Sequence, residues 1–187
     1  VDPRLLLCIG FGCLAASNFL LTGLTADWDF NEFVVPQILR GIGYMFTIIP
    51  ANVLALGTLP PERVKNASGL YNLMRNLGGA FGLAGINTLL EHRTNFHWAR
   101  VGEAIDPTRP EVQAAFQGLT QRFSGFPGVD ASAAAAHTIG QMVMREATVM
   151  SFLDVFWAMA WISLSAIVVV MLARKPKAAP QPGGGGH

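Results

Sequence analysis

The chain has few charged residues. Of its 187 residues, 13% are aspartate, glutamate, lysine or arginine, and 51% are hydrophobic. An average soluble domain has about 25% charged residues, so this sequence carries roughly half the usual share. The net charge of +1 excludes a strongly basic protein, and the lysines and arginines form no stripe that a nucleic acid would contact. The composition is that of a membrane protein, and we expect no nucleic-acid partner.

Cysteine is scarce, and no residue pattern typical of an enzyme is found. Cys8 and Cys13 lie five residues apart in an apolar run, on different helix faces, so we interpret both as packing residues. His92 and His97 lie close to Glu91 but lack the further ligands of a metal site. The sequence has no phosphate-binding glycine loop, nucleophile elbow or zinc motif. We therefore expect neither an enzyme nor a bound cofactor.

What the sequence does contain is long hydrophobic runs. Crossing the hydrocarbon core of a bilayer, about 30 Å thick, takes about 20 apolar residues in a helix. Four runs meet this length: Leu5–Leu24, Val34–Gly57, Ser68–Leu90 and Phe152–Ala173. The predicted fold is an all-α integral membrane protein with four transmembrane helices. Because only VDPR precedes the first run and no initiator methionine is present, we expect a piece of a longer protein.

Lysine and arginine in the short connections indicate which helix ends face the cytoplasm. Arg4, the turn 59–67 with Arg63 and Lys65, and the RKPK segment after the last run all fall on one side. The opposite short connection, TADWDFNEF, has three acidic residues and neither lysine nor arginine. We therefore expect both termini in the cytoplasm. The Pro/Gly-rich tail, 174–187, is expected to be disordered.

The connection 91–151 is long and is expected to lie outside with two helices of its own. Thr108 followed by Glu111 has the spacing of a capping box. Apolar residues then recur at helical spacing over about three turns; they are Val112, Ala115, Phe116, Leu119 and Phe123. After the breaker SGFPG, Asp130 is placed to cap an alanine-rich helix that leads toward the last span.

The third run carries an arginine, Arg75, inside an apolar segment. Small and polar residues share its face of a helix; they are Ser68, Tyr71, Gly78, Gly82 and Gly85. A charge facing lipid costs from about 3 to more than 10 kcal/mol, so this face is expected to turn into protein. The pair Gly78 and Gly82 allows a neighbouring backbone to approach closely. Arg75 is then either a structural arginine that bonds a neighbouring helix, which we favour, or part of a substrate or coupling pathway.

The second run has a similar polar face that includes Arg40 and Tyr44. Pro50 removes a backbone hydrogen bond near the middle of the span and favours a kink. Arg40 lies near the outer end, so extension of its side chain to the interface is favoured over lining a polar path.

Asp154 is the carboxylate nearest to the core of any span, as expected of a proton carrier. Ser151, three residues earlier, gives a capping-box spacing, so we favour an acid at a helix start at the outer interface. The pathway or bundle-interior candidates are Arg75, Arg40, Tyr44, Tyr71, Asn72 and Asp154. The helix-packing candidates are Gly41, Gly78, Gly79, Gly82, Gly85 and Pro50.

Three segments together resemble a known family: RGIGYMFTIIPANVLAL, LPPERVKNASGLYNLMRNLGGAFGLAGINTLL and REATVMSFLDVFWAMAWI. They are similar to the C-terminal end of the fourteen-helix drug/proton antiporters of the major facilitator superfamily, the EmrB/QacA family. The long loop before the last run is most like the EmrB branch. The resemblance makes the four runs helices eleven to fourteen. Arg40 and Gly41 match the family's arginine-glycine pair, and Arg75, Gly78, Gly79 and Gly82 match its asparagine-arginine-glycine stretch.

The resemblance implies proton-driven efflux of hydrophobic compounds across the bacterial inner membrane by rocking of two helix bundles. The implied partners are the remaining helices of the full transporter, the lipid bilayer, drug-like substrates and protons, and a periplasmic adaptor with an outer-membrane channel. The N-terminal bundle of such a transporter is absent from this chain. A small four-helix membrane protein that acts by packing against partners, without transport, is therefore the alternative.

Overall fold

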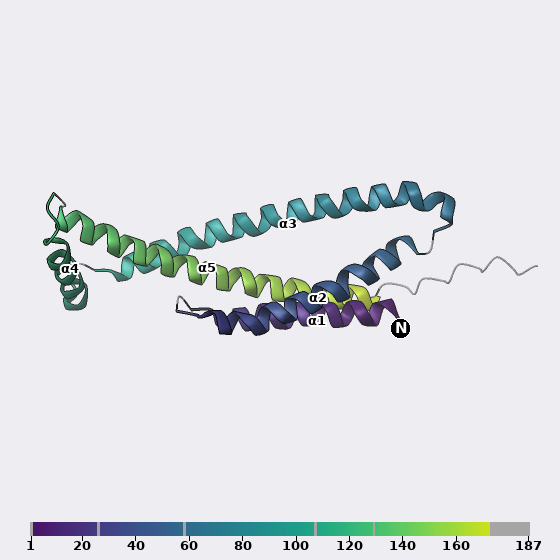
Figure 1. Ribbon diagram of the computed structural model, residues 1–187, viewed down its shortest axis with the longest axis horizontal. Helices are drawn as coiled ribbons and strands as arrows, with labels where there is room; N and C mark the ends of the chain where they lie inside the picture. The colour runs from purple at the N-terminus through teal and green to yellow at the C-terminus, as the bar shows by residue number, and fades with distance from the viewer. Residues whose placement is uncertain (1, 26, 58, 107, 129, 173–187) are drawn as a thin grey trace, which may run out of the picture. The chain divides into compact units, whose positions relative to one another are not determined.

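The computed structural model describes residues 2–25, 27–57, 59–106, 108–128 and 130–172. These residues form five helices (Figure 1), namely α1 (Pro3–Leu21), α2 (Phe30–Leu56), α3 (Pro61–Ala104), α4 (Pro110–Phe123) and α5 (Ala131–Leu172). The predicted all-α fold is confirmed for this part of the chain. The tail expected to be disordered, 174–187, lies outside the described residues.

The helices divide into two compact units. The first takes in α1, α2, the part of α3 up to Ile86 and the part of α5 from Phe156. The second takes in 24–27, the rest of α3 from Asn87, α4, and α5 up to Val155. Helices α3 and α5 thus each contribute residues to both units.

Within the first unit, α1 and α2 pack at close range through two buried glycines. A Cβ atom on Gly43 of α2 would lie 2.8 Å from the carbonyl oxygen of Gly10 on α1. A Cβ on Gly10 would lie 2.6 Å from the Thr47 hydroxyl oxygen. The Ser17 hydroxyl donates to the Pro36 carbonyl oxygen at 2.8 Å in a buried position. The absence of side chains at both glycines thus allows the two backbones to touch.

Three of the described helices are long and apolar enough to cross a membrane, namely α1, α2 and α5. Helix α3 has 44 residues, so length does not exclude it. Its apolar stretch is interrupted by Asn72, Arg75 and Asn76, which lower its mean hydropathy below that of the other three. The expected third span, Ser68–Leu90, lies entirely within this helix.

Helix α3 continues to Ala104 instead of ending near Leu90. No glycine or proline occurs between Gly85 and Gly102, so nothing in the polar segment EHRTNFHWAR interrupts the backbone hydrogen bonds. The first part of the connection expected outside is therefore an extension of a helix. The last part of that connection is also helical, because α5 begins at Ala131 and continues through Ser151.

The structure corrects the predicted start of α4. The helix begins at Pro110, with Arg109 as its N-cap. The amide and the hydroxyl of Thr108 both donate to the Asp106 carboxylate, at 2.8 Å and 2.7 Å, and these bonds lower the pKa of Asp106. The capping box predicted for Thr108 and Glu111 was wrong, because Asp106 binds Thr108 and proline takes the first helical position.

The start of α5 agrees with the sequence. The Asp130 carboxylate accepts from the Ser132 hydroxyl at 2.7 Å and from the Ser132 and Ala133 amides at 3.0 Å and 3.2 Å. These bonds hold the pKa of Asp130 below its ordinary value, and the bond from the Ser132 hydroxyl has the largest effect. The predicted cap at Asp130 is confirmed.

Candidate functional site

Three titratable side chains meet in the second unit. Asp154 Oδ2 lies 2.7 Å from His97 Nε2 and 3.3 Å from Arg93 Nε. Arg93 and His97 are four residues apart on α3, so they project from the same face, and Asp154 approaches them from α5. One carboxylate oxygen thus serves both basic side chains.

The three side chains are only partly exposed, at 42% for Arg93, 20% for His97 and 31% for Asp154. An ionised carboxylate has acceptors only, so the hydrogen between Asp154 and His97 is carried by His97 Nε2. Phe96 lies edge-on to the His97 ring, at 5.4 Å between centroids. The Arg93 and Arg100 guanidinium groups each lie 5.9 Å from the Phe96 ring centroid. The cluster combines a guanidinium, a carboxylate and an imidazole.

The geometry overturns the favoured interpretation of Asp154 as an acid at a helix start. Asp154 lies well inside α5, more than twenty residues after its first residue. Ser151 does not cap a helix either, because its hydroxyl donates to the carbonyl oxygen of Ala147 at 2.6 Å. The capping-box spacing was misleading because the helix was already formed by the alanine-rich segment before it.

Arg40 takes part in a second polar contact, within the first unit. Its guanidinium donates to the Asn18 side-chain oxygen on α1 at 3.3 Å and lies 5.9 Å from the centroid of the Phe156 ring on α5. Arg40 is half-buried, while Tyr44, one turn later, is 62% exposed. The predicted extension of the Arg40 side chain to the membrane interface stays a prediction.

The face of α3 that carries Arg75 is open within the described part of the chain. Arg75 and Asn72 are exposed, and Tyr71 is half-buried. A Cβ on any of four glycines in the same stretch would meet no atom within 4 Å; they are Gly78, Gly79, Gly82 and Gly85. Gly41 on α2 is equally free, whereas Pro50 is buried. The packing partners predicted for this glycine-rich stretch are not among the described residues.

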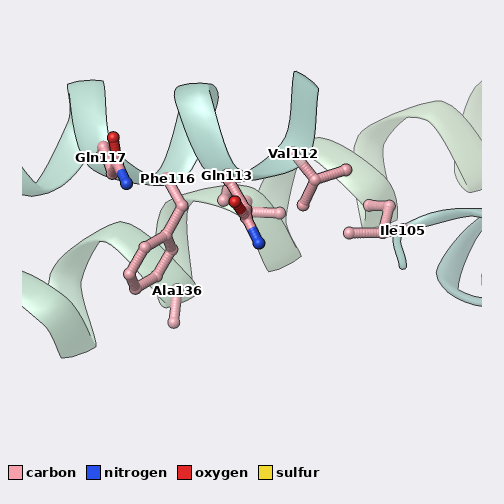
Figure 2. Close-up of a pocket in the computed structure, with 7 residues that line it drawn as sticks. Ile105, Val112, Gln113, Phe116, Gln117 and Ala136 are labelled. Carbon is pink, nitrogen blue, oxygen red and sulfur yellow. The ribbon is translucent and has the colours of Figure 1, made fainter. Parts of the chain in front are cut away.

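The second unit also contains an apolar groove of about 380 Å³. Its walls come from the segment after α3, from α4 and from the first turns of α5. The lining residues are Ile105, Val112, Gln113, Phe116, Gln117, Ala136 and Ile139. Figure 2 shows the Phe116 ring beside Ala136, with the amide groups of Gln113 and Gln117 along the same side. No residue of α4 is fully buried, so the α4 side chains that line the groove stay partly exposed.

Sequence reasoning missed two features of these sites. The close approach of Gly10 and Gly43 was signalled by glycines in two neighbouring spans, but Gly41 drew attention instead. The spacing of Arg93 and His97 placed them on one face. Nothing in the sequence indicates that Asp154, 57 residues after His97, lies opposite them.

The chain is similar to bacterial proteins that are named for drug export or for resistance. It is 34% identical over 177 residues to the colistin resistance protein EmrB of Acinetobacter baumannii, covering 94% of this chain and 34% of that protein. It is 30% identical over 164 residues to the multidrug export protein EmrB of Escherichia coli, covering 85% and 30%. It is 26% identical over 187 residues to the fatty acid resistance protein FarB of Neisseria gonorrhoeae, covering 100% and 35%.

The chain thus spans about a third of the length of these relatives. No family model and no solved structure matches it. The relatives confirm the resemblance to the EmrB/QacA drug transporters, and they match this chain over most of its length.

Proposed function

We propose that this chain is part of a proton-driven transporter of the EmrB type that exports hydrophobic compounds across the bacterial inner membrane. The observation that carries the proposal is the similarity of 85% or more of the chain to an export protein and two resistance proteins. The three apolar helices α1, α2 and α5 support a membrane location. A transporter of this kind has no need of an enzymatic site, so the proposal includes no catalytic residue.

The proposal includes a fourth membrane crossing, formed by Ser68–Leu90 within α3. Arg75 makes this segment less apolar. In a complete transporter, the face of α3 that carries Arg75 would turn toward further helices. The glycines beside Arg75 are open in this chain, so they have room to receive such helices. The exposed Arg75 and the open glycines are consistent with a helix that packs on one side only when the remaining bundle is present.

The proposed partners are the remaining helices of the transporter, the lipid bilayer, drug-like substrates and protons. A periplasmic adaptor and an outer-membrane channel are proposed for the second unit, which would lie outside. Arg40, Tyr44, Tyr71, Asn72 and Arg75 are proposed to face the bundle interior.

The test uses a bacterial host without its own major exporters. Cells that express the complete reading frame containing these 187 residues should expel ethidium, and a protonophore should abolish the efflux. Cells that express the 187 residues alone should retain the dye, because rocking about a central site needs two bundles. Efflux that resists the protonophore would contradict proton coupling. Failure of the complete protein to export, with normal membrane insertion, would instead favour a membrane protein that only packs against partners.

A further inference from the structure

A cluster of three side chains joins the polar extension of α3 to α5, namely Arg93, His97 and Asp154. Its composition allows the strength of this contact to depend on pH. The Asp154 carboxylate contacts one guanidinium and one imidazole. An arginine stays protonated at any physiological pH. An imidazole is the ordinary side chain that changes charge between about pH 5 and about pH 8.

We propose that this cluster is a proton-binding site that holds α3 against α5 more firmly when His97 is protonated. In that state the 2.7 Å contact between His97 Nε2 and Asp154 Oδ2 is a charge-assisted hydrogen bond. When the proton leaves, neutral imidazole still donates from Nε2, but the attraction between opposite charges is lost. Protonation of His97 therefore strengthens a hydrogen bond that is present in both states.

The surroundings favour this behaviour. His97 is only 20% exposed, so water screens its contact less than it screens an ordinary surface pair. Arg93 binds the same oxygen at 3.3 Å, so a positive charge stays beside Asp154 when His97 is neutral. The α3–α5 contact therefore survives at high pH in a weaker form.

The other charged groups near the cluster come from the same two helices. On α3 these are the exposed residues Glu91, His92 and Arg100, of which Arg100 lies against Phe96. On α5, Arg145 and Glu146 lie about two turns before Asp154. Helix α4 lines the groove beside Ile105 and Ile139, and within the described residues the ion pairs of Asp154 are those with Arg93 and His97. His92 is the other imidazole on this stretch of α3 and is exposed, so it supplies a matched control.

The direction of the effect follows from the charges. Lowering the pH protonates His97 and adds an ion pair with Asp154, so the contact strengthens as the solution becomes more acidic. In the proposed orientation this end of the helices faces outside, toward the side from which a proton gradient drives inward flow. The site would then hold the outer ends of α3 and α5 together when that gradient is high. The chemistry of the site does not depend on drug export, so the two proposals fail separately.

The experiment is amide hydrogen exchange on the full chain in lipid nanodiscs at about pH 6 and about pH 8, the range over which imidazole titrates. Exchange is corrected for its intrinsic pH dependence and followed in peptides from 91–104 and 143–155. Partly exposed ion pairs contribute modestly, so protection in both peptides should be about two- to fivefold greater at the lower pH. The variant His97→Gln keeps a donor without the charge and should show the weaker protection at both pH values.

A fixed charge provides the opposite control. His97→Arg should show the stronger protection at both pH values, and His92→Gln should behave like the unaltered chain. Asp154→Asn should also lose the pH dependence, because it removes the negative charge that protonated His97 binds. Unchanged pH dependence in His97→Gln, or equal protection of the unaltered chain at both pH values, would overturn the proposal. Loss of the pH dependence in His92→Gln would also overturn it, because the sensitive group would then be His92.

Discussion

Asp130 shows how one carboxylate decides where a helix begins. It accepts hydrogen bonds from the Ser132 hydroxyl and from the Ser132 and Ala133 amides, and the same bonds lower its pKa. Because the pKa is lower in the folded chain, the stabilisation is present above the ordinary aspartate pKa. It is lost as the pH falls through the lowered value.

We therefore expect the first turn of α5 to fray when the pH falls below the ordinary aspartate range, which is centred near about 3.9. The ¹³Cα chemical shifts of 131–134, followed from neutral to acidic pH, should move toward coil values. Asparagine is as good an N-cap but has no charge, so Asp130→Asn should keep the turn and lose the pH dependence. Fraying that persists in Asp130→Asn would assign the effect to another group.

Capping residues illustrate how far single positions can be read from the sequence. Asp130 follows a glycine and proline segment that ends the preceding helix, so its role was predictable from neighbours within a few residues. The same type of spacing failed at Thr108 because Asp106 competes for it, and at Ser151 because a helix already runs through that position. A local pattern predicts a local bond only where no longer helix and no competing acceptor overrides it.

At the scale of helices, α1 and α2 approach each other closely at Gly10 and Gly43. Two of the three atoms nearest to a Cβ on Gly43 are backbone atoms, which cannot move aside as a flexible side chain does. A Cβ on Gly43 would lie 2.8 Å from the Gly10 carbonyl oxygen and 3.0 Å from the Leu14 amide nitrogen. Any side chain at Gly43 must therefore push the two helices apart.

Gly43→Val should separate α1 from α2 and destabilise the fold by about 1–3 kcal/mol, the usual cost of overpacking. The measurement is the midpoint of thermal unfolding in detergent, followed by circular dichroism. Gly41→Val is the matched control, because a Cβ there meets no atom within 4 Å and both changes add the same side chain to the same helix. Equal destabilisation by both variants would mean that valine acts through helix propensity and not through the contact.

The helices themselves were largely predictable, whereas their lengths were not. Hydrophobic runs located α1, α2 and α5, because a run of apolar residues long enough to cross a bilayer leaves few alternatives. The apolar pattern ended near Leu90, but α3 continues to Ala104 because no breaker follows. Hydropathy indicates which part of a helix lies in lipid, whereas glycine and proline indicate where a helix ends.

For the whole molecule, sidedness is predicted from the charges of the short connections. We expect the segment 59–67, in which α3 begins at Pro61, to lie in the cytoplasm and the second unit to lie outside. In variants that lack Cys8 and Cys13, single cysteines at Lys65 or Gln117 should react differently with an impermeant thiol reagent added to intact cells. Labelling at Gln117 without labelling at Lys65 is expected, and the reverse pattern would invert the orientation.

Long-range contacts mark the limit of what the sequence offered for the candidate sites. The pairing of Asp154 with His97 and that of Arg40 with Asn18 join different helices, and neither leaves a periodic signal. They depend on how the helices are placed side by side. The Arg75 face shows the opposite case, in which the sequence predicts burial and the described residues offer no cover. This difference agrees with the proposal that further helices of a transporter cover the Arg75 face.

Arg75 therefore gives a test that separates the chain from the complete transporter. In the chain alone, Arg75 is exposed and no hydrogen bond or ion pair to it is found among the described residues. Arg75→Ala should leave the folded yield after detergent extraction unchanged. In the complete transporter, the same change should lower the yield, because acceptors that the guanidinium had satisfied would be left unpaired at about 1–3 kcal/mol each.

Arg75→Lys distinguishes a structural role from a pathway role in that transporter. Lysine keeps the charge but loses the planar set of donors, so a structural arginine predicts a folded yield between those of alanine and arginine. A pathway role predicts normal yield for both variants with failed ethidium export. We favour the structural outcome, because the glycines on the Arg75 face leave room for a closely packed helix. Normal yield and normal export of Arg75→Ala would defeat both roles, since the guanidinium would then reach water in the complete protein as it does in the chain.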